Sequence, residues 1–428
     1  MIENGDDMYQ LCHELFPICR SITGKGFRDS LDILKRYMPD LKIVDIPSGT
    51  ACFDWNVPLE WNINDAYVID PDGNKVIDFK KSNLHVVGYS VPVDKVIDLE
   101  ELQNHLYSLP DQPNAIPYVT SYYKERWGFC VTENQRKELK DGSYRVVVDS
   151  ALEKGNLTYG ELILPGASHE EVFLSSYLCH PSMANNELSG PVVTTFIAKW
   201  LIGLNKRKYT YRIIFIPETI GSIAYLSKNL EVMKNNIVAG FNVTCIGDER
   251  TYSYLPSRNG NTLADKVIRH VLKHIYPDYV SYSYLDRGSD ERQYCSPGVD
   301  LPVCSVMRTK YGCYPEYHTS LDDLNLVTAN GLFGGFNVLR RAIECLENNP
   351  VIRSSVLCEP QLGKRGLYPT LSSKGSGDAV RNMMNLLSYS DGASTVLDVA
   401  ETINVPVWEL YEVVSKLKDE NILEYVHG

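Results

Sequence analysis

Apolar residues in the middle of the chain come in continuous runs, and each run is followed by a segment with helical spacing of apolar positions. The runs are EVFLSSYL at 171–178, YRIIFIP at 211–217, IVAGFNVTCI at 237–246 and LPVCSVM at 301–307. The helices are expected from about 189, from about 219, over 261–276 and over 328–348. Because a strand that is apolar on both faces must be covered on both faces, this alternation predicts an α/β body with helices on either side of a sheet.

The chain before this body has a different pattern. Helical spacing over 6–22 and 26–38 comes first. From 50 to 148 the chain is rich in aromatic residues, turn residues and short extended runs, which is typical of a small β-rich module. We therefore predict an α/β domain formed by 1–49 and 149–355, with the β-rich domain 50–148 inserted in it.

The last segment has the spacing of a helix-turn-helix. A stretch rich in Pro, Gly and Ser at 367–378 precedes two helical patterns, TVLDVAETI at 395–403 and PVWELYEVVSKLKDEN at 406–421. The following ILEYV is expected to begin a wing, so we predict a winged-helix domain over 356–428. The charged residues of the second helix are Glu409, Glu412, Lys416, Lys418, Asp419 and Glu420. A helix that enters a groove lined by phosphates should be basic, so docking of a protein partner or covering of the substrate is favoured over nucleic-acid binding.

Composition narrows the class of protein further. A net charge of -12 over 428 residues argues against broad binding to nucleic acid or anionic membranes. No apolar run approaches the roughly 18 residues of a membrane span, and the start MIENGDDMYQ has no signal-peptide core. The 11 cysteines are scattered without a C-x-x-C pair. They indicate reduced thiols in a cytoplasmic protein.

Polar residues follow three of the predicted strands directly. His180 comes after the first run, Glu218 after the second and Asp248 after the third. Because the carboxyl ends of parallel strands meet at one edge of a sheet, we expect these side chains to converge. Taken alone, the histidine has a simpler explanation as part of a polar loop, and the glutamate as a helix N-terminal charge.

A second histidine, His318, lies in YPEYHTSLDDLNLV, with Asp322 four residues after it. Neutral imidazoles and carboxylates are zinc ligands, so His180, Glu187, Asp248 and His318 are candidate ligands. Asp322 either holds the second ring nitrogen of a ligating histidine or is an ordinary helix N-terminal residue.

Four segments resemble the co-catalytic zinc aminopeptidases and related carboxypeptidases, in the order that those enzymes show. They are H…NNELSG at 180–190, FIPETIGS at 215–222, RGSDERQYCSPGVDLPV at 287–303 and HTSLDDL at 318–324. Over nearly its full length the chain is similar to a bacterial and archaeal aminopeptidase-like family associated with polysaccharide biosynthesis. The resemblance implies a zinc-aminopeptidase-like mixed sheet, an inserted small domain and a C-terminal winged helix. It also implies that Glu218 is a general base for a metal-bound water. Asp290 and Arg287 would bind substrate, unless they form only a solvated charged turn.

The chain departs from the peptidase pattern at several positions. Asn186 stands where those enzymes have an aspartate that bridges two metals, and Thr219 stands where they have a second glutamate. Thr244 lies near the place of a third acidic ligand, and Ser182 replaces the aspartate that orients the first histidine. These departures favour a single zinc ion, with a second one left as an alternative.

The single zinc would be held by His180, Glu187 and His318, with Asp248 as a further candidate ligand. RHVLKH places His270 and His274 on one helical face, as in H-E-x-x-H metalloproteases. The position of the essential glutamate is Val271, so we predict a surface helix with two histidines.

The predicted function is a metal-dependent amide hydrolase of aminopeptidase type, acting on a small aminoacyl or amino-sugar compound in surface-polysaccharide metabolism. An amide-forming or cyclising enzyme is an alternative on the same scaffold. A non-catalytic ligand sensor that reports through its winged helix is the alternative from another class. The expected partners are the small substrate and a second copy or a protein bound through the winged helix. The inserted domain, with Trp55, Trp61, Tyr67 and Tyr89, is expected to border the mouth of the site.

Overall fold

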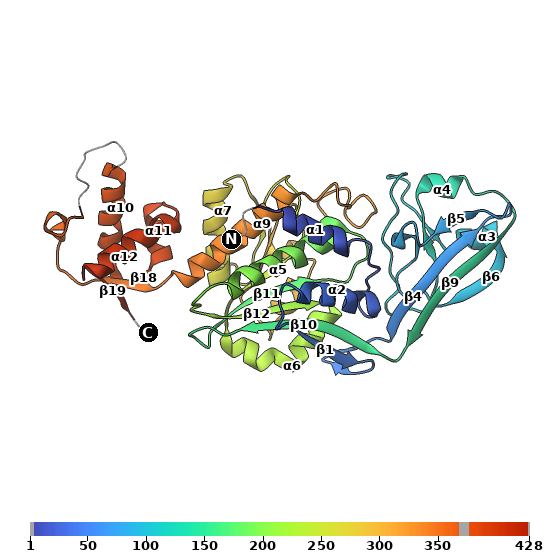
Figure 1. Ribbon diagram of the computed structural model, residues 1–428, viewed down its shortest axis with the longest axis horizontal. Coiled ribbons are helices and arrows are strands. Elements are labelled where there is room, and N and C mark those ends of the chain that lie inside the picture. Colours follow the sequence, from blue (N-terminus) through green and yellow to red (C-terminus); the bar gives the residue numbers. More distant parts are fainter. Residues whose placement is uncertain (1–3, 368–375, 427–428) are drawn as a thin grey trace. The chain divides into compact units, whose positions relative to one another are not determined.

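The computed structural model describes residues 4–367 and 376–426 and divides into two units (Figure 1). One unit comprises Met1–Asp265 and Val280–Asn337, and the other comprises Lys266–Tyr279 and Val338–Gly428. Most of the predicted Pro-, Gly- and Ser-rich break at 367–378 lies outside the described residues.

The first unit is built on an eight-stranded mixed sheet in the order β1-β10-β12-β11-β13-β16-β14-β15. Its strands are β1 Lys42–Pro47, β10 Asn156–Leu164, β11 Glu171–Tyr177, β12 Thr210–Ile216, β13 Ile237–Val243, β14 Ser253–Leu255, β15 Val280–Ser281 and β16 Val303–Met307. Strands β12, β11, β13 and β16 form a parallel centre, and β1, β10 and β14 pair in antiparallel fashion. Every residue of β11 is buried, as a strand covered on both faces requires.

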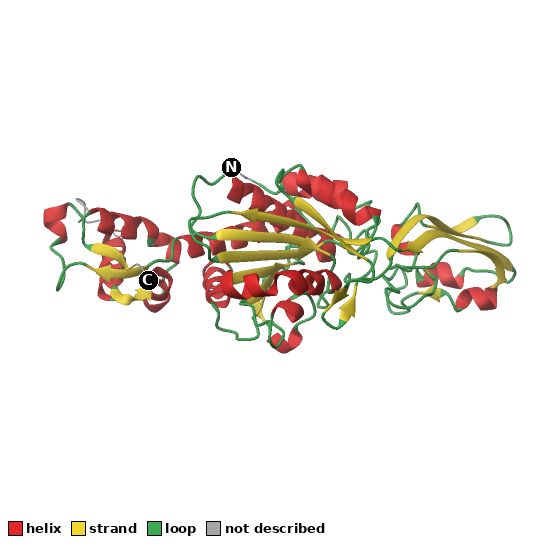
Figure 2. Ribbon diagram, turned by 90° about the horizontal axis from the view of Figure 1, so that it is seen from below, coloured by secondary structure: helices red, strands yellow, loops and turns green. Residues whose placement is uncertain are grey.

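Helices cover both faces of this sheet, as Figure 2 shows. They are α1 Asp6–Leu15, α2 Lys25–Lys35, η2 Ala184–Leu188 (a π-helical turn), α5 Ser189–Ile202, α6 Ile220–Asn236, η3 Tyr284–Asp286 and α8 Glu291–Tyr294. Helices α7 Leu263–Ile275 and α9 Ala329–Glu347 span the division between the units. The predicted α/β fold class is confirmed. Helix α1 ends well before the predicted residue 22, because Pro17 has no N–H to continue the helical hydrogen bonds.

The inserted module is β-rich, as predicted. Its main sheet has the order β5-β4-β9-β6, with β4 Glu60–Ile69, β5 Lys75–Asp78, β6 Val93–Asp98 and β9 Ser143–Glu153. The smaller elements are β2 Ala51–Cys52, β3 Trp55–Asn56, η1 Asn83–His85, α3 Leu99–Gln103, β7 Leu106–Tyr107, β8 Phe129–Cys130 and α4 Glu133–Lys137. Figure 1 shows the long strands β4 and β9 leading away from the larger sheet side by side.

The second unit contains the winged helix. Its elements are β17 Val351–Ser354, η4 Leu362–Arg365, α10 Ser376–Ser388, β18 Asp391–Thr395, α11 Val396–Ile403, η5 Val407–Glu409, α12 Tyr411–Asp419 and β19 Leu423–Val426. Helices α11 and α12 are the two helices of the predicted helix-turn-helix, and β19 is the strand expected after it. Strand β17 pairs with both β18 and β19. The sheet of the winged helix therefore begins N-terminal to the predicted boundary at 356.

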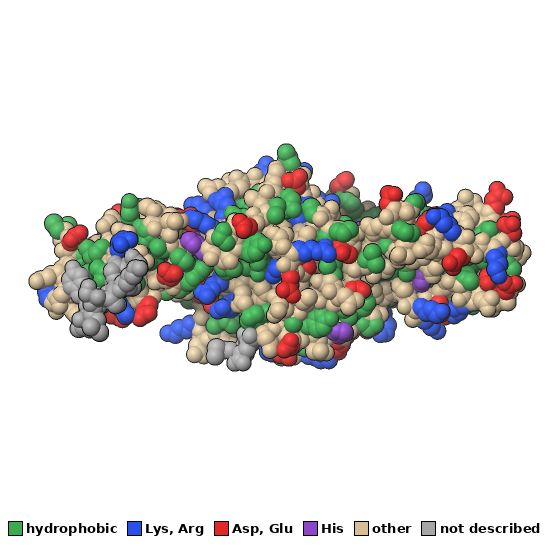
Figure 3. All heavy atoms as spheres, turned by 90° about the horizontal axis from the view of Figure 1, so that it is seen from above, with side chains coloured by type: hydrophobic (Ala, Val, Ile, Leu, Met, Phe, Trp, Pro, Cys, Tyr) green, Lys and Arg blue, Asp and Glu red, His purple; other side chains and the backbone are tan. Residues whose placement is uncertain are grey.

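The surface carries charges of both signs. Figure 3 shows basic and acidic side chains intermixed on the face that it draws, in keeping with the acidic net charge of -12. Within the described part of the chain, no helix combines the length and the apolar character that a membrane crossing needs.

Candidate functional site

The site lies at the carboxyl edge of the parallel strands. Strands β11 and β12 are neighbours in parallel register, with Tyr177 opposite Ile216. The chain therefore delivers His180 and Glu218 to the same place, and His180 Nε2 lies 3.8 Å from Glu218 Oε2. The convergence expected from the strand ends is present for these two residues.

The other side of the His180 ring faces Glu187. His180 Nδ1 and Glu187 Oε2 are 2.5 Å apart, and both side chains are buried. Cys179 Sγ is 3.5 Å from the same nitrogen. Glu187 comes from η2, whose irregular turn carries it back toward the histidine. One ring nitrogen of His180 is thus held by a carboxylate, and the other is left to face Glu218.

Arg20 supplies a buried positive charge behind this pair. Its Nε donates to the His180 carbonyl at 3.1 Å and its Nη1 to the Leu15 carbonyl at 2.6 Å. Burial raises the pKa of Glu187 well above its usual range, and the Arg20 charge opposes that rise. Burial, followed by the Arg20 charge, lowers the pKa of His180 to about 3. Sequence reasoning missed Arg20, because nothing in its local sequence marks an arginine that becomes buried 160 positions from its partner.

His318 completes the site from the opposite loop. The His180 and His318 rings have centroids 5.3 Å apart. Tyr118, from the inserted module, packs on both histidines, at 4.9 Å from His180 and 5.3 Å from His318. Its backbone N–H also donates to the His318 carbonyl at 2.9 Å. Burial and the neighbouring His180 lower the pKa of His318 to about 3, so both imidazoles are neutral and keep lone pairs for a metal.

These groups line one cavity of about 300 Å³. Glu218, His180 and His318 are on its wall, and the inserted module contributes Tyr118 and Trp55 among others. The described residues that line this cavity include no lysine or arginine. Burial, and next the charge of Asp290, raise the pKa of Glu218 to about 8. A carboxylate with a pKa near neutrality suits proton transfer.

The predicted substrate-binding residues lie behind or outside the cavity. Asp290 Oδ1 accepts the Thr219 N–H and the Ser222 hydroxyl, both at 2.8 Å, and burial raises the pKa of Asp290 to about 6. It therefore supports the turn that carries Glu218. Arg287 is exposed, and its guanidinium lies 4.8 Å from the centre of the Tyr284 ring. Neither residue lines the cavity that holds Glu218.

Asp248 forms hydrogen bonds with neighbouring loops and does not lie beside His180 in the cavity. Its carboxylate accepts the Thr309 N–H at 2.9 Å and hydroxyl at 2.7 Å, and the Asn185 side-chain amide at 3.0 Å. Two acceptor oxygens used in this way hold the loops after β13 and β16 together. Asp248 is also absent from the residues that line the cavity. The structure therefore does not bring it together with the other candidate ligands.

Asp322 caps the turn η2. Its carboxylate accepts the backbone N–H groups of Asn185 at 2.6 Å and Asn186 at 2.9 Å, and the Tyr314 hydroxyl at 3.1 Å. Burial raises its pKa to about 6. Asp322 was expected to orient a histidine, but the carboxylate that contacts His180 is that of Glu187.

Several residues of the site have left-handed backbone conformations. Of the ten described non-glycine residues with positive φ, four are Ser182 (38°), Thr219 (65°), Cys245 (47°) and His318 (56°). Such residues persist only where the surroundings hold them, and they cluster at functional sites. Thr219 is held by Asp290, and His318 by the backbone of Tyr118.

The donors facing the cavity fit one zinc ion. The imidazoles of His180, through Nε2, and His318 face one space and could hold the ion, with Glu218 beside them as a proton acceptor. The buried atoms of Cys179, His180 and Glu187 also lie within 4.8 Å of one another. However, His180 Nδ1 is already bonded there, and the Arg20 charge acts against a second cation on that side.

The positions where the peptidases carry further acidic ligands are filled by a neutral network. The Thr244 hydroxyl donates to the Tyr177 hydroxyl at 2.5 Å, which in turn donates to Asn186 Oδ1 at 3.2 Å. A second divalent cation needs negatively charged oxygens, and these groups are neutral at pH 7. They fit a single metal and not a pair.

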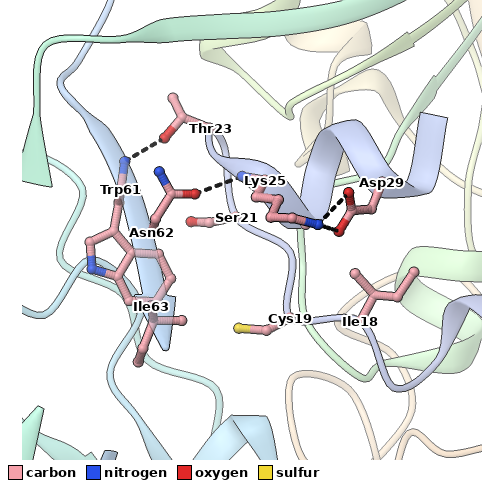
Figure 4. Close-up of a pocket in the computed structure, with 10 residues that line it drawn as sticks. Ile18, Cys19, Ser21, Thr23, Lys25, Asp29, Trp61, Asn62 and Ile63 are labelled. Carbon is pink, nitrogen blue, oxygen red and sulfur yellow. Dashed lines mark hydrogen bonds and ion pairs between the residues drawn. The ribbon is translucent and has the colours of Figure 1, made fainter. Parts of the chain in front are cut away.

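A smaller cavity of about 160 Å³ lies where the segment 18–29 meets β4 (Figure 4). Several of its polar groups are paired with one another: Thr23 accepts the Trp61 N–H, Asn62 accepts the Lys25 N–H, and Lys25 binds Asp29. It contains none of the predicted site residues. This cavity marks the junction between the body and the inserted module.

His270 is not on the surface, which corrects the prediction of a surface helix with two histidines. It is 1% exposed, its Nδ1 contacts Glu401, and its Nε2 accepts the Val407 N–H at 2.9 Å. Within the second unit it therefore fastens α7 to the helix-turn-helix. Both ring nitrogens are used in this way, which leaves His270 no lone pair for a metal.

Two family models match the chain. One, described as "Domain of unknown function (DUF4910)", matches residues 9–349, and a winged helix-turn-helix model matches residues 350–425. A protein of Clostridium acetobutylicum is 48% identical over 402 residues, which are 93% of this chain and 91% of that protein. It is provisionally named a polysaccharide biosynthesis protein with an aminopeptidase-like domain.

Solved structures agree with this assignment. The crystal structure of a provisionally assigned peptidase from Clostridium acetobutylicum has a TM-score of 0.93 at 45% identity, covering 99% of this chain and 96% of that one. A zinc aminopeptidase from Bacillus subtilis has a TM-score of 0.57 at 12% identity, covering 79% and 94%. A peptidase M28 precursor from Shewanella amazonensis has a TM-score of 0.56 at 12% identity, covering 82% and 94%. The last two show the fold alone. The chain thus belongs to a family of aminopeptidase-like proteins, associated by name with polysaccharide biosynthesis, that carry a C-terminal winged helix.

Proposed function

We propose that the chain is a zinc-dependent amide hydrolase of aminopeptidase type. The observation that carries this proposal is the pair at the ends of β11 and β12. Glu218, whose pKa burial raises to about 8, lies 3.8 Å from His180 on the wall of a cavity shared with His318. A base poised near neutrality beside two neutral imidazoles suits hydrolysis of an unactivated carbonyl compound.

One zinc ion would be held by His180 through Nε2 and by His318. When bound, it would supply Lewis acidity toward a carbonyl oxygen and lower the pKa of a water molecule. Glu218 takes the proton of the attacking water and passes it to the leaving amine. Glu187 keeps the Nδ1 proton of His180 in place, so that Nε2 is the free nitrogen. The Arg20 charge favours the ionised form of Glu187 that this arrangement needs.

The cavity supports a small substrate. About 300 Å³ lies at the lower end of the range for ligand sites, which is enough for one small amide-bearing compound. A substrate carboxylate would find no lysine or arginine among the described lining residues. We therefore favour an aminoacyl or amino-sugar compound over a carboxypeptidase substrate. The name of the Clostridium relative points to surface-polysaccharide metabolism.

A non-catalytic sensor is the second candidate function. The neutral residues Asn186, Thr219 and Thr244 at positions of metal ligands, together with a winged helix, favour it. The exposed side of α12 pairs Glu412 with Lys416 at 2.7 Å and also carries Asp419 and Glu420. This composition supports a protein partner or a second copy, and it weighs against nucleic acid. The cysteines, all 11 of them free thiols, support a reducing, cytoplasmic location.

Turnover by the wild type and by Glu218→Gln tests the proposal. Both proteins, loaded with zinc, are incubated with a panel of aminoacyl amides and N-acyl amino sugars, and the released amine is measured. Wild-type turnover that falls by about 10²–10⁴-fold in Glu218→Gln, with zinc content unchanged, supports hydrolysis. Equal turnover in both proteins removes Glu218 from the mechanism. Ligand binding without turnover by the wild type supports the sensor.

A further inference from the structure

The aromatic residues of the inserted module divide into two groups with different surroundings. Trp61 and Tyr89 are stacked with centroids 5.7 Å apart, and they are 3% and 1% exposed. They belong to the core of the module. Trp55 and Tyr123 also contact each other, at 5.5 Å and an interplanar angle of 67°, but they are 37% and 59% exposed. We call Trp55 and Tyr123 the aromatic platform.

The platform lies on the cavity that contains Glu218 and His180. Both of its residues line that cavity, Trp55 from the short hairpin of β2 and β3. Phe53, at the turn of the same hairpin, is 60% exposed but does not line the cavity. Exposed aromatic faces at the mouth of a cavity are surfaces on which a ligand can be buried.

The rest of the cavity wall carries hydroxyl groups, which suit a ligand with several hydroxyl groups of its own. Five of the twelve lining residues carry a hydroxyl group: Tyr118, Thr120, Tyr122, Tyr123 and Thr219. Two of these hydroxyls, on Tyr118 and Tyr122, are bonded to each other at 2.6 Å and so are held in fixed directions. The described lining residues include no lysine or arginine that could bind an anionic group of the ligand directly.

A sugar ring has the matching chemistry. One face of a pyranose is made of C–H groups, which pack on aromatic rings, and its rim carries hydroxyl groups. We propose that the aromatic platform binds a pyranose ring of the substrate, neutral or amine-bearing, whose amide group extends to His180 and Glu218. This inference rests on the proposed function, and it selects the amino sugar from the two substrate classes considered there. The cavity of about 300 Å³ leaves room for one ring and its amide substituent.

The test measures binding, which does not require turnover. The probes are N-acetyl-D-glucosamine and N-acetyl-L-phenylalaninamide, which share an acetamide group but differ in the ring that would meet the platform. Saturation-transfer NMR and titration are carried out on the full-length wild type, on Trp55→Ala and on the matched control Phe53→Ala. We expect the wild type and Phe53→Ala to bind N-acetyl-D-glucosamine with equal affinity. Trp55→Ala should bind it roughly 2–10-fold more weakly, the usual range for one aromatic contact. Saturation transfer should be strongest at the ring C–H protons.

Three results would overturn the inference: no binding of the sugar, tighter binding of the phenylalanine compound, or equal loss in the two variants. Zinc content and thermal unfolding of both variants show whether a loss of binding reflects damage to the fold, and Tyr123→Ala then provides a second test of the platform. Hydrolysis of L-leucinamide is measured in parallel. Hydrolysis without sugar binding refutes the platform and leaves the hydrolase intact. Sugar binding without hydrolysis of any amide supports the platform and refutes the hydrolase.

Discussion

Replacing Glu187 by glutamine tests whether this residue orients His180 or binds the metal itself. The carboxylate lies 2.5 Å from His180 Nδ1, and its side chain is completely buried. Glutamine keeps the shape of the side chain but removes the charge that fixes the Nδ1 proton. The free nitrogen of His180 is then no longer held as Nε2, the nitrogen that faces the cavity.

The size of the effect follows from this geometry. Removing a carboxylate that orients a ligating histidine typically weakens metal binding by about 10–100-fold, which corresponds to about 1.4–2.7 kcal/mol. A second effect acts on folding. Arg20 is 1% exposed, and the Glu187 charge opposes the lowering of its pKa by burial, so removing that charge should destabilise the fold. The metal-free variant should therefore unfold at a clearly lower temperature.

Three matched variants separate the two effects. Glu187→Gln combined with Arg20→Met removes both charges, so it should recover much of the folding stability while zinc binding stays weak. Glu171→Gln breaks a buried carboxylate–arginine ion pair in the main sheet, in which Arg212 Nε lies 2.5 Å from Glu171. It should lower the unfolding temperature without changing zinc affinity. Zinc affinity is measured by competition with a chromophoric chelator and stability by calorimetry of the metal-free proteins.

Unchanged zinc affinity in Glu187→Gln would refute the orienting role. Complete release of the metal on dialysis, with a cobalt spectrum in the wild type that indicates a further carboxylate ligand, would restore Glu187 as a ligand. Recovery of zinc affinity in the double variant would also contradict the reasoning, because it would mean that Glu187 acts only through folding stability.

Four further outcomes are expected. Freshly purified protein should hold one zinc per chain after dialysis, and His318→Ala should lose it while Tyr317→Phe keeps it, as measured by plasma mass spectrometry; two retained equivalents would contradict this. Activity of the zinc-loaded protein should rise with pH as Glu218 gives up its proton, at a pH below the value of about 8 to which burial raises its pKa without metal, because a nearby cation favours the carboxylate. Glu218→Gln should remove this rise along with about 10²–10⁴-fold of the rate. Asp290→Asn should move the rise of activity to lower pH, since the Asp290 charge helps to raise the pKa of Glu218. A rise at unchanged pH would exclude this influence of Asp290 on Glu218. Metal-free protein should lose thermal stability as pH rises from about 7 to about 8, because burial raises the pKa of Glu218 to about 8, so the folded state keeps a proton there that the unfolded state has lost; at lower pH the buried histidines His180 and His318, with pKa lowered to about 3, act in the opposite direction. A melting temperature that rises between about pH 7 and about pH 8 would refute it.

Much of the fold was predictable because its determinants are local. The run 171–178 is apolar at almost every position, and it became a wholly buried central strand. Helices α5 and α6 begin within a residue or so of the expected starts at 189 and 219. The extent of α1 was overestimated, because helical spacing continued past Pro17, where the backbone could no longer follow.

The site was predictable only where strand ends set it. His180 and Glu218 follow adjacent parallel strands, so their convergence could be inferred from the chain alone. Arg20 and Tyr118 could not be found in this way, since they reach the site from the loop between α1 and α2 and from the inserted module through contacts that no spacing encodes. Asp248 follows a strand as His180 does, but the loop after β16 engages its carboxylate first.

The neutral residues of the site explain why the fold of a zinc aminopeptidase does not by itself imply two metals. Asn186 and Thr244 are joined through the Tyr177 hydroxyl in a buried chain of hydrogen bonds. Such a chain is satisfied without a cation, whereas carboxylates at the same positions would repel one another unless a metal lay between them. These neutral groups offer no charged ligand to a second metal, which supports the proposal of a single zinc ion. Among the described residues that line the cavity, Glu218 is the one carboxyl group, and it lies beside two neutral histidines. In the proposed function this site would assist one proton transfer at one zinc ion, and the inserted module, which contributes Trp55, Tyr118, Thr120, Tyr122 and Tyr123 to the wall, would select the substrate.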